Sequence, residues 1–228
     1  MYRLLFVFLF FNSLFAIAQT ESGIAQTESG IAQTESGIAQ TESGIAQTEH
    51  GIEQVVTVAD KSFLKRDFEQ PAAQGEQDPE ENRLRQEIFY FSQVNTFILR
   101  GLVEDYAKQN QIEPEPAHIA GFKQVYANTG LTEEKLDSLA HFNALRFAVD
   151  KNLFKQFGGR VVFDQGHPNM PIEAYTKLLM AYKKMGRLVF HEQKYETLFW
   201  KSLERPGALD IPSADVKFDT PWWMRVAR

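Results

Sequence analysis

The segment PEENRLRQEIFYFSQVNTFILRGLVEDYAKQ, residues 79–109, decides the fold class of this chain. Apolar residues recur along it at helical spacing, which predicts one long α-helix; they are Leu84, Ile88, Phe91, Ile98, Leu102 and Tyr106. Pro79 suits the first turn of a helix, and Glu80 and Glu81 lie near its N-terminus, where the helix dipole favours negative charge. We expect this helix to contact other elements on two sides, because further apolar residues widen its surface: Phe89, Tyr90, Phe97 and Leu99.

Two more helices are predicted directly after this one. Pro114 and Pro116 break the chain, and the apolar pattern that follows stops at Gly130, a residue typical of helix ends. Thr132 is a favourable N-cap for a third helix, which we expect to end near Phe157 because two glycines follow it. The pattern therefore predicts a mainly α domain.

The folded part of the chain is predicted to start at Gln54. Val55, Val56 and Val58 favour a short strand, because β-branched residues fit an extended backbone. Residues 61–70 follow with an apolar spacing that is consistent with a short helix.

Residues 158–228 are predicted to form an α+β extension that packs on the helical region. The runs RVVF and RLVF indicate two short strands near 160–164 and 187–191, which either pair with each other or flank a helix in a strand–helix–strand unit. Pro171 opens the helix expected between them. The last residues, 221–224, are apolar enough that we expect them to dock on the domain.

Residues 1–18 have the pattern of a cleaved secretory signal peptide. A short positive start precedes an apolar run, and small residues at 16–18 precede Gln19, which predicts cleavage after Ala18. The apolar run is about 8 residues long, well short of the roughly 20 that span a bilayer. We therefore predict a periplasmic protein with no stable membrane insertion after cleavage.

Residues 19–53 are a seven-residue repeat. The unit QTESGIA occurs at 19, 26, 33 and 40, and a diverged copy starts at 47. A coiled coil is excluded because the two apolar residues of each unit are adjacent, whereas a coiled-coil seam needs separate a and d positions. Each unit also carries a glycine, which costs a helix about 1 kcal/mol. The segment is predicted to be a disordered, acidic linker.

Composition excludes several classes of function. The chain has no cysteine, so thiol catalysis and thiolate metal sites are excluded. Six of its 30 acidic residues and one of its 24 basic residues precede Gln54, which leaves 24 acids and 23 bases in the rest. No run of Lys and Arg occurs, so the sequence predicts no nucleic-acid partner.

Polar residues next to the two C-terminal strands are the strongest candidates for catalysis. Asp164 and His167 follow the first strand, and His191 and Glu192 follow the second, so paired strands would bring the four side chains together. Loop polarity is the commoner explanation of such residues, and we predict no metal site and no cofactor. A small exported hydrolase or metal-dependent enzyme that uses these four residues is kept as an alternative.

Residues 54–157 resemble the N-terminal region of SurA-like and PrsA-like extracytoplasmic folding factors. That family opens with approximately V-A-x-V-N-G-x-x-I-x-x-x-x-F, and this chain has VVTVADKSFLKRDF at 55–68, with Ala59-Asp60 in place of Asn-Gly. The helical rhythm of the family is also matched farther on, by Leu99 to Leu102 and by the sequence Gly130-Leu131-Thr132. The resemblance implies a helical module that binds extended, aromatic-rich segments of unfolded exported proteins. No parvulin-type isomerase domain is seen, so the resemblance implies no isomerase activity.

A peptide-binding role needs an apolar surface rather than a catalytic group. Seven aromatic residues are the candidates for this surface: Phe63, Phe68, Phe89, Tyr90, Phe97, Phe122 and Phe142. We expect a periplasmic folding factor that binds unfolded polypeptide without catalysis. A structural protein, whose aromatic residues form a fixed partner interface, is a further alternative.

Overall fold

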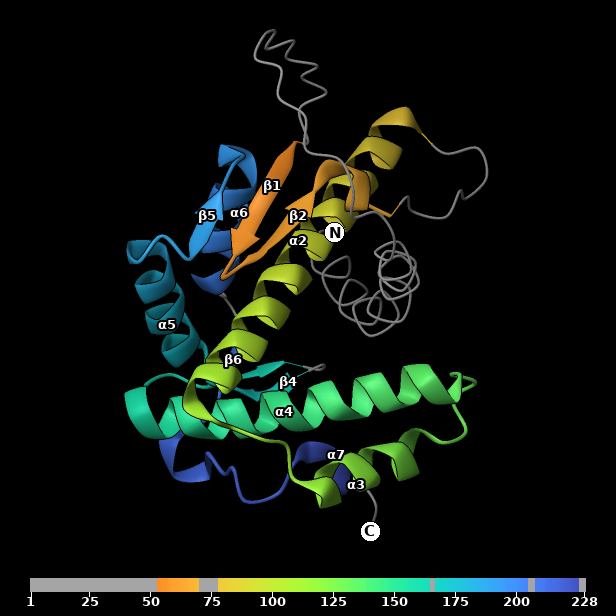
Figure 1. Cartoon of the computed structure of the whole chain (residues 1–228), viewed down its shortest axis with the longest axis vertical. Coiled ribbons are helices and arrows are strands. Elements are labelled where there is room, and N and C mark those ends of the chain that lie inside the picture. The colour runs from red at the N-terminus through yellow and green to blue at the C-terminus, as the bar shows by residue number, and fades with distance from the viewer. Residues whose placement is uncertain (1–52, 70–77, 165–166, 205–207, 226–228) are drawn as a thin grey trace, which may run out of the picture.

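The computed structural model describes residues 53–69, 78–164, 167–204 and 208–225, and these residues form a mainly helical fold with two small sheets (Figure 1). The helices are α2 (Pro79–Asn110), α3 (Pro116–Tyr126), α4 (Glu133–Phe157), α5 (Ile172–Lys184), α6 (Gln193–Glu204) and α7 (Trp222–Arg225). The strands are β1 (Gln54–Val58), β2 (Lys61–Leu64), β3 (Val162–Asp164), β4 (His167–Met170), β5 (Leu188–Phe190) and β6 (Leu209–Asp210). Two 3-10 turns complete the set, η2 (Lys65–Asp67) and η3 (Ser213–Asp215). The predicted fold class is therefore confirmed, whereas the predicted signal peptide and all but the last residue of the repeat lie outside the described residues.

Helix α2 begins and ends as its sequence predicts. The Asp78 side chain caps the helix by accepting a hydrogen bond from the backbone N–H of Glu80 at 3.0 Å, and Pro79 occupies the first turn. The C-terminal cap is Gln111, in the left-handed conformation. Val94, Ile98 and Leu102 are fully buried, and α2 contacts β1 on one side and α4 on another. The long helix is thus the element against which both the sheet and the helical layer pack.

The first sheet has the strand order β2-β1-β5, and all its strands are antiparallel. One sequence prediction is wrong here, and one of the two arrangements left open for the C-terminal strands is excluded. The short helix expected over residues 61–70 is instead strand β2 followed by η2, because Phe63 packs inward from an extended backbone. The C-terminal strands do not pair with each other, because β5 pairs with β1 while β3 lies in the second sheet.

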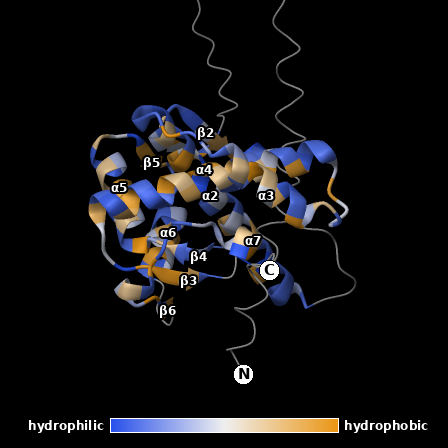
Figure 2. Ribbon diagram, turned by 90° about the horizontal axis from the view of Figure 1, so that it is seen from below, coloured by the Kyte–Doolittle hydropathy of each residue, from blue (hydrophilic) through white to orange (hydrophobic). Residues whose placement is uncertain are grey.

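The second sheet has the order β4-β3-β6. Phe163 of β3 lies opposite Leu209 of β6, and both side chains are substantially exposed. Figure 2 shows β3 in the colour of hydrophobic residues, next to the label of β6.

Helices α3, α4 and α7 enclose a second core. The indole N–H of Trp223 donates a hydrogen bond to the backbone carbonyl of His118, and its ring packs edge-on against Phe122. The C-terminal segment therefore docks, as its composition predicts. Helix α4 supplies residues to both cores, among them Leu139 to the second and Leu153 to the first. None of the described helices combines the length and the apolar character that crossing a membrane requires.

Candidate functional site

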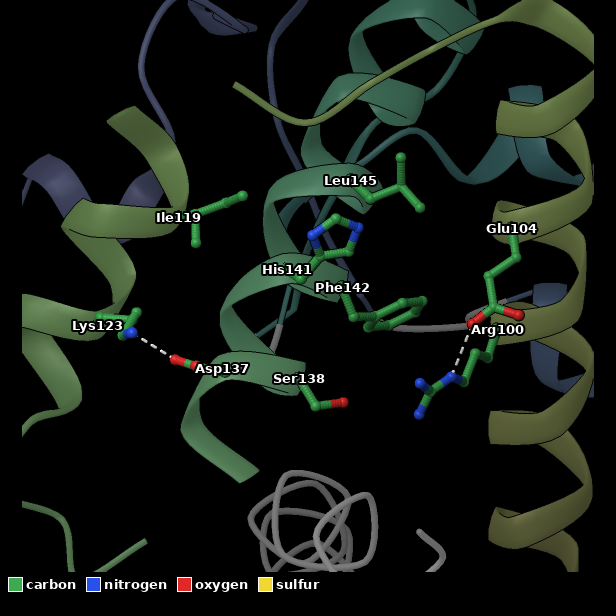
Figure 3. Close-up of a pocket in the computed structure, with 9 residues that line it drawn as sticks. All are labelled: Arg100, Glu104, Ile119, Lys123, Asp137, Ser138, His141, Phe142 and Leu145. Carbon is green, nitrogen blue, oxygen red and sulfur yellow. Dashed lines mark hydrogen bonds and ion pairs between the residues drawn. The ribbon is translucent and has the colours of Figure 1, made fainter. Parts of the chain in front are cut away.

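A cleft of about 680 Å³ lies between α2, α3 and α4 (Figure 3). Helix α4 supplies most of its surface, and α2 and α3 supply the two sides. Its lining residues are Arg100, Glu104, Ile119, Lys123, Asp137, Ser138, His141, Phe142 and Leu145. The volume lies within the roughly 300–1,000 Å³ that is typical of ligand sites.

The α2 side of the cleft is built from a charged pair. Arg100 and Glu104 are one helical turn apart, so the guanidinium Nε reaches the carboxylate at 2.9 Å. The Glu104 carboxylate also accepts a hydrogen bond from Lys61 of β2 at 2.9 Å. Burial raises the pKa of Glu104, but the hydrogen bonds from Lys61 and Arg100 outweigh burial and hold that pKa below its ordinary value. Arg100 also lies over the Phe142 ring, 5.3 Å from its centroid, which fixes the aromatic wall of the cleft.

The α3 side carries a second charged pair. Lys123 forms an ion pair with Asp137 of α4, and Figure 3 shows the two side chains turned toward each other. Ile119 lies on the same side, one turn before Lys123. His141 is exposed on α4 between the two charged pairs. The cleft therefore offers apolar side chains and ionic groups side by side.

Asp137, Ser138 and His141 are the residue types of a hydrolase triad, but they are not arranged as one. In such a triad the carboxylate orients the imidazole, which in turn activates the hydroxyl. Here the Asp137 carboxylate is engaged by Lys123 across the cleft, and Figure 3 shows it directed away from the His141 ring. These three residues are therefore not in triad geometry.

The seven aromatic residues predicted to bind peptide are distributed over three places. Most of them form one chain of ring contacts, in which Phe63 of β2 is 5.2 Å from both Phe68, just after η2, and Phe97 of α2. The Phe68 ring is also 4.7 Å from that of Tyr90. Phe89 extends this chain beside Tyr90.

The other two predicted residues are separate from this chain. Phe122 lies in the second core beside Trp223, and Phe142 forms part of the cleft wall. Phe63 and Phe122, 5% and 1% exposed, stabilise the fold and do not face a ligand. Phe142 is 8% exposed, and the small part of its ring that is accessible lies in the cleft wall. Phe68, Phe89, Tyr90 and Phe97 are partly exposed.

The four polar residues of the enzyme alternative do not meet. His191 donates to or accepts from the Thr57 hydroxyl at 3.0 Å, and Glu192 pairs with Lys65 at 3.3 Å, both at the first sheet. Asp164 and His167 are cross-strand partners in the second sheet. The expected convergence depended on pairing between the two C-terminal strands, which does not occur. No group of acidic and histidine side chains suited to a metal ion is found within the described ranges.

His167 instead takes part in a buried polar cluster that the sequence did not predict. The Asp150 carboxylate, 3% exposed, accepts hydrogen bonds from the Tyr175 hydroxyl at 2.6 Å and from His167 Nε2 at 2.5 Å. Burial lowers the pKa of His167, and the Asp150 carboxylate opposes the shift. Burial also raises the pKa of Tyr175. The cluster joins α4, β4 and α5 by two hydrogen bonds to one carboxylate.

The sequence held only a weak signal for these sites. Asp150 occurs in the apolar stretch that ends at Leu153, and a charge at such a position indicates a buried partner. Arg100 and Glu104 have ion-pair spacing, but that spacing is common on exposed helices.

Searches against protein-family models, curated proteins and solved structures gave no match to this chain.

Proposed function

We propose that this protein is an exported folding or assembly factor that holds extended polypeptide in the cleft between α2, α3 and α4. No bond is made or broken in this role. The observation that carries the proposal is the lining of the cleft, which combines an open hollow of about 680 Å³ with apolar side chains and paired charges but no assembled acid–base group. Export rests on the signal-like residues 1–18.

The cleft can accept many sequences because its contacts are of two adaptable kinds. Ile119, Phe142 and Leu145 offer apolar surface, which attracts apolar side chains without a directional requirement. The Lys123 and Asp137 side chains are partly exposed, at 38% and 52%, so they can exchange their mutual contact for contacts with a client backbone or side chain. The clients we propose are therefore unfolded exported polypeptides with mixed apolar and polar sequences.

The test fills the cleft in the mature chain, residues 19–228. His141 is exposed on α4 and lines the cleft, so His141→Trp adds bulk there without disturbing a buried contact. Aggregation of a denatured outer-membrane protein is followed by light scattering after dilution into buffer. The unsubstituted chain is expected to suppress aggregation at stoichiometric excess, and His141→Trp is expected to suppress it several-fold less.

Lys151→Trp is the matched control, because Lys151 is exposed on the same helix but does not line the cleft. It should suppress aggregation as well as the unsubstituted chain. Equal aggregation with and without the unsubstituted chain would overturn the proposal. Suppression for one client only, among several of unrelated sequence, would favour the fixed partner interface instead.

A further inference from the structure

The described chain starts at a point that is fixed to the first sheet. The backbone N–H of Lys65 donates a hydrogen bond to the Glu53 carbonyl at 2.9 Å, and the two side chains also form an ion pair. Everything before Glu53, including the repeat at 19–52, is therefore tethered at the start of β1.

This tether point is close to the cleft. Val56 of β1 pairs with Phe63 of β2, and the Phe63 ring is 5.2 Å from Phe97 on α2. Phe97 lies three residues before Arg100, which lines the cleft. With about 3.3 Å per strand residue, 1.5 Å per helix residue and the reach of the two Phe side chains, Glu53 is within roughly 35 Å of the cleft along this path.

The repeat is long enough to reach the cleft and has a composition that fits it. An extended chain spans about 3.3–3.6 Å per residue, so two seven-residue copies cover roughly 48 Å. Each complete copy carries one isoleucine and one glutamate, and the segment holds no lysine or arginine. The cleft presents Phe142 and Leu145 to an isoleucine and Lys123 and His141 to a glutamate.

We propose that the repeat segment, residues 19–52, binds in the cleft of its own chain and competes there with client polypeptide. Only the competition with client rests on the proposed function. The docking of the repeat is argued from the length of the repeat and from its amino-acid composition. A tethered ligand acts at an effective concentration in the millimolar range for a short linker, so even weak binding occupies the cleft. Several identical copies make interchangeable ligands, so a client must displace one copy at a time.

The experiment uses the chain from Gln19 to Arg228 with a single spin label. The protein has no cysteine, so Ala39→Cys gives one attachment site for a nitroxide within the repeat. Paramagnetic broadening of amide NMR signals is expected at Ile119, His141 and Leu145, and not at Leu209 on the second sheet. Adding His141→Trp should abolish the broadening in the cleft. Broadening spread evenly over the surface, or broadening in the cleft that His141→Trp leaves unchanged, would overturn the docking.

A second variant of the same chain tests the competition. Replacing the repeat isoleucines by serine removes the apolar anchors and changes no described residue; these are Ile24, Ile31, Ile38, Ile45 and Ile52. Loss of the broadening together with several-fold tighter client binding supports the proposal. Loss of the broadening with unchanged client binding would show that the competition is wrong while the docking holds. Failure of client binding in every variant would overturn the proposed function but leave the broadening experiment intact.

Discussion

At the scale of single residues, Asp150 is a buried carboxylate that depends on hydrogen-bond donors from other elements. Its carboxylate is 3% exposed and accepts hydrogen bonds from the Tyr175 hydroxyl and from His167. Tyr175→Phe keeps the buried ring and removes one donor. A hydrogen bond to a charged group contributes about 1.5–3 kcal/mol, so we expect the free energy of unfolding to fall by about that amount. Urea denaturation followed by far-UV circular dichroism measures it.

Tyr126→Phe is the control for this substitution. The Tyr126 ring packs against Phe122 and Trp222, and its hydroxyl has no hydrogen-bond partner among the described residues. Its loss should change the free energy of unfolding by less than about 0.5 kcal/mol. If Tyr175→Phe were no more destabilising than Tyr126→Phe, then Asp150 would not depend on this donor.

At the scale of elements, Gly101 sets how closely α2 approaches the first sheet. A Cβ built at this position lies 3.2 Å from Cγ1 and 3.3 Å from Cβ of Val58, a buried β-branched residue that cannot turn away easily. Gly101→Ala gains about 1 kcal/mol of helix propensity, but overpacking of this kind costs about 1–3 kcal/mol. We expect a net loss of stability, measured by urea denaturation.

A double-mutant cycle identifies the cause of that loss. Val58→Ala removes the contacted methyl groups and is destabilising on its own, but the added alanine at 101 then has room. The double variant is therefore expected to be more stable than the sum of the two single effects allows, by 0.5 kcal/mol or more. Strict additivity would show that Val58 does not limit the approach of the helix.

The same elements show what local sequence can and cannot predict. Helices α2, α3 and α4 were predictable because their periodicity and start signals are local, as Pro79 and Thr132 illustrate. Strand β2 was mistaken for a helix because a short apolar run has no period that distinguishes the two. The pairing of β1 with β5 joins Val56 to Phe190, and no local pattern specifies a partner so distant in sequence.

At the scale of the whole molecule, the cleft illustrates a different limit of prediction from sequence. Its residues come from three helices, and their convergence depends on how those helices cross, which periodicity alone does not determine. The aromatic residues were predicted by type, but type does not separate a core ring such as Phe122 from a partly exposed one such as Phe68. Only Phe142 was both predicted and found in the cleft wall.

Helix α4 supplies side chains to both cores, so the two cores should unfold together. Trp223, 1% exposed, is the largest buried side chain of the second core, and Trp223→Ala is expected to lower the free energy of unfolding by about 3–5 kcal/mol. Because α4 links the two cores, the loss of stability should also reach β1, which lies in the first core. The free energy of opening obtained from amide hydrogen exchange in β1 should therefore fall by as much as the free energy of unfolding obtained by circular dichroism. Leu209→Ala is the control, since Leu209 is 69% exposed and its loss should change little. Faster exchange confined to α3 and α7, with β1 unchanged, would show instead that the second core opens independently while the first remains folded.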